Sequence, residues 1–164
     1  MAEPASGYSL LFDLFVANGH VRTLLARTLA DAPLRADEYA VYSVLFENGP
    51  TSPTELSRIL GLPPTTISDH VRTMVRREHA SRRERPHDQR MHELALTPAG
   101  LTAHRATSMR FQHAMRAIED RLELAPDAVR ASLRALGDAA RRANQDPQTV
   151  SGARPAWSTD RPRR

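Results

Sequence analysis

The sequence predicts a mainly helical α+β fold that contains one small β-hairpin. Three observations support this prediction. Apolar residues recur at steps of three and four over most of the chain, which is the period of an amphipathic helix. Near the middle, two short helical segments are separated by a glycine, and the pattern then switches to the alternation of strands. Long amphipathic segments lie on either side of this central region.

Composition limits the class of protein. The 164 residues suit a single domain with its own core, and 40% hydrophobic against 26% charged residues is typical of a soluble helical protein. No apolar run approaches the roughly 18 residues of a membrane span. Residues 1–7 lack the basic and apolar segments of a signal peptide. We therefore expect a cytoplasmic protein.

Composition also limits the kinds of site. Cysteine is absent, so disulfides, thiolate metal ligands and cysteine nucleophiles are excluded. All 23 basic residues are arginine, which we attribute to codon bias, and the net charge is +4. The placement of the arginines is more informative, because seven of them crowd residues 72–90 beside only three acids. This concentration indicates a surface that binds phosphate groups.

The N-terminal part predicts two helices. Between Tyr8 and Ala30 the apolar spacing predicts one long amphipathic helix, which Pro33 ends. A second helix is predicted from Ala36 to Glu47, and Asn48-Gly49-Pro50 closes it. Its inward residues are expected to be Tyr39, Tyr42, Leu45 and Phe46.

A third, short helix has an unusually complete start signal. Ser52 is a capping residue, Pro53 occupies the first helical position and Glu55 the third, which is the pattern of a capping box. This helix is expected to direct Leu56, Ile59 and Leu60 toward the core.

A fourth helix follows Gly61, which supplies a tight turn, and runs from Pro64 to Arg77. Its apolar residues Ile67, Val71, Met74 and Val75 repeat at helical spacing. Two helices joined in this way form a helix-turn-helix, whose second helix offers its polar face to DNA.

Beyond Ala80 the sequence predicts the hairpin and two more helices. Strands are expected over residues 81–85 and 92–97, with turn residues at 86–89. A helix from Pro98 to about Leu122 is predicted to bury Leu101, Met109, Phe111, Met115 and Ile118. The last helix, from Ala125-Pro126 to about Ala143, carries Val129, Leu133, Leu136 and Ala140 on its inner face. Residues 144–164 contain three prolines and few apolar residues, and are predicted to be a disordered tail.

A resemblance to a known family is carried by the segment after the fourth helix. Asp88-Gln89-Arg90 followed by Leu94-Ala95-Leu96-Thr97-Pro98-Ala99-Gly100 is similar to the wing signature of MarR-family transcriptional regulators. Ser52 to Leu56, Leu60 to Leu62 and the helix order from Tyr8 to Ala143 extend the resemblance. It implies a winged helix-turn-helix lobe over residues 34–97, flanked by dimerisation helices at 8–30 and 98–143 within one domain.

By this resemblance the fourth helix is the recognition helix and the hairpin is a wing. Arg90 would enter the minor groove, where negative potential attracts arginine, and Asp88 would orient its guanidinium. Asp69 is an unusual residue on a groove-facing helix, since it can accept from cytosine or form a salt bridge with Arg72, and both alternatives stay open. The candidate DNA-binding residues are Pro64, Thr65, Thr66, Ser68, Asp69, His70, Arg72, Thr73, Arg76, Arg82, Asp88 and Arg90. The segment from Glu78 to Arg82 departs from the family's pattern because it lacks the usual glycine, so the geometry of the helix-to-wing turn stays open.

The resemblance also implies partners. A homodimer would place two recognition helices about one duplex turn apart on a pseudo-palindromic site in double-stranded DNA. Many relatives bind a small aromatic ligand between the dimerisation helices and the DNA-binding lobe. The candidate ligand-binding residues are Asn18, His20, Tyr39, Tyr42 and Arg105, although both tyrosines also suit the core. We expect a repressor that such a ligand releases, and no cofactor.

Three other classes of function were weighed. Seven histidines permit a metal-responsive regulator, but none forms an i,i+4 pair on one predicted helix. An enzyme would need a nucleophile with its base, a phosphate loop or paired carboxylates, and no such motif occurs. A non-DNA-binding interaction module on the same fold would have little use for the arginine cluster.

Overall fold

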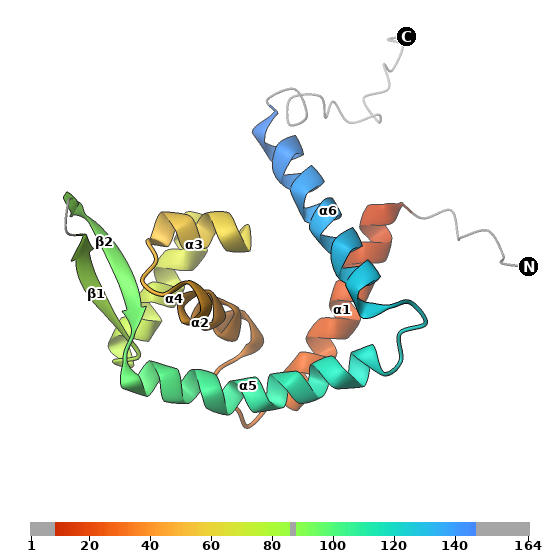
Figure 1. The fold of residues 1–164 in the computed structure, drawn as a ribbon, viewed down its shortest axis with the longest axis horizontal. Helices are drawn as coiled ribbons and strands as arrows, with labels where there is room; N and C mark the ends of the chain where they lie inside the picture. The colour runs from red at the N-terminus through yellow and green to blue at the C-terminus, as the bar shows by residue number, and fades with distance from the viewer. Residues whose placement is uncertain (1–8, 86–87, 147–164) are drawn as a thin grey trace, which may run out of the picture. The chain divides into compact units, whose positions relative to one another are not determined.

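The computed structural model describes residues 9–85 and 88–146, and the side chains of residues 84–91 are outside that description. The elements in this part of the chain are α1 (Leu10–Thr28), α2 (Ala36–Asn48), α3 (Pro53–Leu60), α4 (Pro64–Arg76), β1 (Ala80–Arg85), β2 (Asp88–Leu96), α5 (Pro98–Glu119) and α6 (Pro126–Gln145) (Figure 1). The predicted fold class is confirmed, with a helix-turn-helix in α3–α4 and a wing in β1–β2. The chain divides into two units, residues 1–120 and 121–164, so α6 is described by itself. No helix among these residues is long and apolar enough to cross a membrane.

The two strands form an antiparallel hairpin that is longer than predicted. Ala80 pairs with Leu96 and Arg83 with Glu93, and the register becomes irregular between Glu84 and Arg85. A third short segment joins the hairpin, because Thr51 and Leu94 exchange both backbone hydrogen bonds, at 3.0 and 2.9 Å. This bridge holds Thr51, which precedes the N-cap of α3, against the wing.

The core of the first unit lies where α2, α3, α4 and the hairpin meet, and α5 packs against α1, α2 and β2 (Figure 1). Its fully buried side chains include Leu34, Val41, Tyr42, Leu56, Ile67, Met74 and Leu94. With the buried Ala80 of β1, these residues come from every element of the lobe, so the lobe closes its own apolar core within one chain.

Some side chains predicted to point inward are exposed. Phe46, Ile59 and Val75 keep 42%, 40% and 40% of their surface accessible. Each lies at the border of an apolar face, where a spacing of three or four residues does not distinguish centre from edge. In α5 the predicted inward Met109 is 71% exposed, and the buried face is instead formed by Gly100, Ala103, His104, Thr107 and Ala114. Mostly small side chains let α5 approach the lobe closely.

The predicted start of α3 is confirmed in part. The Ser52 hydroxyl accepts from the Glu55 N–H at 3.2 Å, and Pro53 is the first helical residue. The Glu55 carboxylate, however, accepts two bonds from the Arg58 guanidinium, at 2.8 and 2.5 Å. The Arg58 guanidinium therefore holds the carboxylate that the capping-box pattern predicted to bind the backbone N–H of Ser52.

Helices α1 and α6 differ from the lobe because neither contains a buried residue. In α1, Leu10, Leu11 and Phe15 are all more than 60% exposed, and the predicted inner face of α6 includes Leu133, which is 54% exposed. The tail prediction falls mostly outside the described residues, since α6 extends to Gln145 and the description ends at residue 146.

Candidate nucleic-acid interface

The polar face of α4 is the first part of the candidate interface. Ile67, Val71 and Met74 point into the core. Directly opposite them, at steps of four, three and four along the helix, lie the exposed residues Thr65, Asp69, Arg72 and Arg76, which we call the outer stripe. Pro64 and Ser68 are also exposed, whereas Thr66, His70 and Thr73 are half-buried on one flank. The sequence-predicted residues of α4 are thus brought together on the surface that the core leaves free.

Hydrogen bonds on this face order the two arginines of the stripe. The Asp69 Oδ1 atom accepts from the Arg72 Nη1 atom at 3.0 Å, and both side chains are 71% exposed. Arg76 Nη2 lies 3.5 Å from the Thr73 hydroxyl oxygen. Of the two alternatives for Asp69, the chain without DNA adopts the ion pair with Arg72.

Two shallow grooves run between α4 and the base of the wing. One, of about 360 Å³, is lined by Ser52, Pro53, Thr54, Val71, Arg82, His92 and Leu94. The other, of about 280 Å³, is lined by Pro53, Ser68, Val71, Arg72, Val75 and Arg82. Arg82 of β1 lines both grooves, so this sequence-predicted residue lies where the wing meets α4.

The tip of the wing lies largely outside the described residues. Asp88 and Arg90 belong by their backbone to β2, but their side chains are not described. Their predicted roles therefore stay predictions.

The turn from α4 to the wing resolves the geometry that the missing glycine left open. Glu78 adopts a left-handed conformation with φ 57°. Its N–H donates to the Val75 carbonyl, and the His79 N–H donates to the Met74 carbonyl, both at 2.9 Å. This is the Schellman pattern that normally ends on glycine, with glutamate in that place.

Several further contacts fix the same turn. The buried Tyr42 hydroxyl is hydrogen-bonded to the His79 Nδ1 atom at 2.9 Å, and burial raises the pKa of Tyr42. The Thr97 hydroxyl donates to the Glu78 carbonyl at 2.7 Å, and the Thr97 N–H donates to the His79 carbonyl at 3.0 Å. At Gly100 an added Cβ would lie 2.1 Å from the His79 carbonyl oxygen, so only glycine permits this approach of α5. Helix α4 and the wing are therefore joined through one tightly packed turn.

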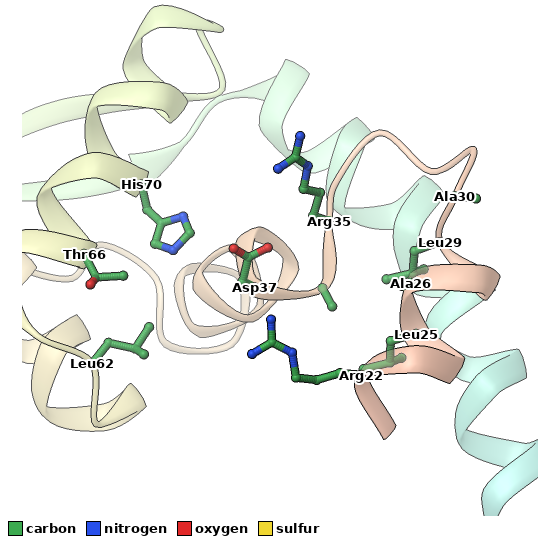
Figure 2. Close-up of a pocket in the computed structure, with 11 residues that line it drawn as sticks. Arg22, Leu25, Ala26, Leu29, Ala30, Arg35, Asp37, Leu62, Thr66 and His70 are labelled. Carbon is green, nitrogen blue, oxygen red and sulfur yellow. The ribbon is translucent and has the colours of Figure 1, made fainter. Parts of the chain in front are cut away.

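A separate pocket lies on the flank of α4 that carries Thr66 and His70, within the first unit. It has a volume of about 800 Å³ and is lined by Arg22, Leu25, Ala26, Leu29, Ala30, Arg35, Ala36, Asp37, Leu62, Thr66 and His70. Figure 2 shows the polar side chains of Arg22, Arg35 and His70 around Asp37, with Leu25 and Ala26 of α1 and the adjoining Leu29 forming an apolar wall. We call this the α1–α4 pocket.

None of the five sequence-predicted ligand residues lines the α1–α4 pocket. Asn18, His20 and Arg105 are exposed, and Tyr42 is buried with its hydroxyl bound to His79. Tyr39 is buried against the rings of His104 and Phe111. Sequence reasoning missed Arg22, Arg35 and Asp37. The only available signal was that Arg22 shares a helical face with Leu25, Ala26 and Leu29.

Among the described residues, no three histidine, aspartate or glutamate side chains lie close enough together to hold a metal ion.

Comparisons with known proteins agree on the fold. A family model for "Winged helix-turn-helix DNA-binding" matches residues 38–78, which span α2 to the end of α4. No curated protein matches the sequence.

Among solved structures, the chain is similar to a probable transcriptional regulator from Pseudomonas aeruginosa, with 26% identity, 78% of this chain and 96% of that chain covered, and a TM-score of 0.70. It is also similar to the PcaV transcriptional regulator from Streptomyces coelicolor, solved in complex with its natural ligand, with 25% identity, 85% and 99% coverage and a TM-score of 0.68. The transcriptional repressor CouR, bound to a 23-mer DNA duplex, shares the fold at 22% identity, with 85% and 99% coverage and a TM-score of 0.70.

Proposed function

We propose that the chain is a MarR-type, sequence-specific DNA-binding repressor that acts as a homodimer, and the winged helix-turn-helix fold that it shares with transcriptional regulators supports this proposal. The observation that carries the proposal is the outer stripe of α4. It presents hydroxyl, carboxylate and guanidinium groups on the face opposite the core, beside the arginine-lined grooves at the base of the wing. Such groups hydrogen-bond base edges and phosphates in the major groove.

The residues around the outer stripe take roles that follow from their positions. Arg76, at the C-terminal end of the outer stripe, and Arg82, in the grooves beside it, suit phosphate contacts because they lie at the edges of this surface. For Asp88 and Arg90 we keep the roles that the wing signature implies, with Arg90 in the minor groove and Asp88 orienting it.

Dimerisation is the second part of the proposal. The apolar side chains of α1 and α6 are exposed in the single chain, and a helix with such a surface normally packs against a partner. A two-fold dimer would place its two α4 helices about 10 to 10.5 base pairs apart on a pseudo-palindromic site. A regulator that acts on DNA would also fit the cytoplasmic location expected from the sequence.

Release by a small ligand is the third part. CouR is a repressor seen on DNA, and PcaV is a regulator seen with its natural ligand. The α1–α4 pocket combines an apolar wall with two arginines, which suits a small aromatic ligand that carries acceptor groups. Because Thr66 and His70 of α4 line this pocket, a ligand bound there can favour one placement of α4 (Figure 2). Its effect is limited to its difference in affinity between the two placements.

The experiment is a fluorescence-anisotropy titration of the full chain against DNA that flanks its own coding region, at two salt concentrations, with a random duplex as control. We expect tight, site-selective binding that weakens steeply with salt. The Arg76→Ala variant should weaken binding to all sequences about equally and lower the salt slope by about one unit. Binding no better than to the random duplex, from a folded dimer, would contradict the proposal and favour the interaction module.

A further inference from the structure

We infer that Arg72 reads a guanine in the major groove and that Asp69 is the residue that orients it, so that this pair sets the base preference of the recognition helix. This inference rests on the proposed function and names the residues that give it sequence specificity.

The position of the pair is the first argument. Asp69 and Arg72 lie in the middle of the outer stripe, diametrically opposite the buried Ile67, Val71 and Met74. When a helix enters the major groove with its core face outward, the residues of the opposite stripe come closest to the base edges. Arg76 and Arg82 lie nearer the edges of this surface, where the phosphate backbone runs.

The geometry of the ion pair is the second argument. Side chains of a helix lean toward its N-terminus, and Asp69 lies one turn N-terminal to Arg72. The bond of 3.0 Å between Asp69 Oδ1 and Arg72 Nη1 therefore holds the guanidinium over the N-terminal half of α4. That half is the one that contacts bases in helix-turn-helix proteins.

The number of donors is the third argument. A guanidinium has five N–H donors in a planar fork, and the bond to Asp69 uses one of them. The remaining donors suffice for the bidentate bond to O6 and N7 of guanine. A carboxylate on its own can only accept, and guanine presents only acceptors in the major groove, so Asp69 acts on guanine through Arg72.

The test begins with selection of binding sites for the wild-type chain from a random duplex library, followed by anisotropy titrations on the selected site and its single-base variants. We expect the wild type to prefer guanine at one position of each half-site. Arg72→Ala should lose this preference, with about a 10- to 100-fold loss of discrimination between guanine and the other bases at that position alone. Asp69→Asn should weaken the preference at the same position by a smaller factor. Arg72→Lys should also lose it, because an ammonium keeps the charge without the fork.

Controls separate this role from folding and from general charge. Asp138→Asn removes a similar acid–arginine pair, that of Asp138 and Arg141, on α6 and should leave every base preference unchanged. Thermal unfolding of each variant checks the fold. Because Asp69 and Arg72 are exposed, we expect the unfolding temperatures to stay close to that of the wild type.

Three results would overturn the inference while leaving the proposed function intact. If Arg72→Ala weakened all sequences equally, Arg72 would be a phosphate contact. If Asp69→Asn abolished a preference for cytosine at a position that Arg72→Ala left unchanged, Asp69 would read a base itself. If Asp69→Asn changed neither affinity nor preference, Asp69 would have no orienting role. By contrast, if the wild-type chain selected no sequence from the library, the proposed function itself would be wrong.

Discussion

The winged lobe and the terminal helices treat their apolar residues in opposite ways. In the lobe, α2, α3, α4 and the hairpin bury Val41, Leu56, Ile67 and Leu94 almost completely within one chain. In α1 and α6, by contrast, no residue is buried. The lobe therefore has a core of its own, whereas the terminal helices have apolar surface that a single chain leaves in water.

The two regions therefore gain their stability from different sources. The lobe is held by contacts within the chain, so changes there should alter unfolding independently of protein concentration. The terminal helices would gain their stability from a second copy, so changes there should depend on concentration.

The largest effect is expected from Phe15→Glu in α1. Phe15 is 75% exposed in the single chain, and we place it in the dimer interface. Burying a phenylalanine contributes about 1.5–3 kcal/mol, and two-fold symmetry counts it twice. We therefore expect the dissociation constant of the dimer to rise roughly 100- to 10,000-fold, measured by sedimentation velocity over a range of concentrations.

The matched control is Ile59→Glu, which places the same charge on a partly exposed apolar residue of the lobe. It should leave the oligomeric state unchanged. A Phe15→Glu protein that stays dimeric at concentrations where the wild type is dimeric would break the comparison, because the exposed face of α1 would then not be the interface.

The second effect is expected from Gly100→Ala, at the start of α5 where this helix packs against the lobe. The new Cβ would lie 2.1 Å from the His79 carbonyl oxygen and 3.2 Å from the Leu96 side chain. That carbonyl accepts from the Thr97 N–H, so the backbone must shift and weaken the turn between α4 and the wing. We expect the free energy of unfolding to fall by about 1–3 kcal/mol, measured by urea denaturation.

Gly137→Ala in α6 is the matched control, since an added Cβ there meets no atom within 4 Å. Alanine is the better helix former, so stability should stay equal or rise by up to about 1 kcal/mol. If both variants behaved alike, the close approach at Gly100 would have no energetic role.

Sequence reasoning predicted the order of the elements well because their signals are local. Ser52 and Pro53 mark the start of α3, and Gly61, with φ 65°, makes the left-handed turn before α4. The alternation after Ala80 marks the hairpin. Each signal depends on a few neighbouring residues and on backbone chemistry that acts within them.

The parts that sequence reasoning missed depend on residues far apart in the chain. The α1–α4 pocket brings Arg22 of α1 together with His70 of α4, a proximity that no spacing pattern records. The Tyr42 hydroxyl bond to His79 spans 37 residues, and it places in the core a side chain that the sequence also suited to a ligand. Asp69 was left between two roles because its partner is settled by side-chain geometry rather than by residue type.

A third effect, on the pH dependence of stability, is expected from replacing His104, which lies where α5 meets α2. Its ring stacks on the rings of Tyr39 and Phe46, with distances between ring centroids of 5.0 and 4.5 Å. The Ser43 hydroxyl donates to the Tyr39 carbonyl, so it accepts from His104 Nε2, and the buried Nδ1 atom has no hydrogen-bond partner among the described residues. A proton on Nδ1 would therefore be buried without an acceptor.

The pH dependence follows from this environment. Burial lowers the pKa of His104 from the usual 6.5; Glu47 acts against the shift and Arg105 adds to it. The unfolded chain then binds the proton more tightly, so stability is fully present above pH 6.5 and is lost as the pH falls below it. We expect His104→Gln to reduce this loss in unfolding experiments between pH 7.5 and 5, and a wild-type stability that is flat over this range would contradict the role.

The smallest effect is expected from Glu78→Gly at the end of α4, and it has the opposite sign. Glu78 has φ 57°, a conformation that costs a residue with a Cβ about 1–2 kcal/mol, whereas glycine adopts it freely. Part of that gain is offset by the greater entropy of glycine in the unfolded chain, so we expect urea denaturation to show a net gain of up to about 1 kcal/mol. Gln112→Gly, in the middle of α5, should instead lose about 1 kcal/mol. Because Glu78→Gly acts within one chain, its effect should not vary with protein concentration, and a gain that appeared only in the dimer would place this turn with the terminal helices instead of the lobe.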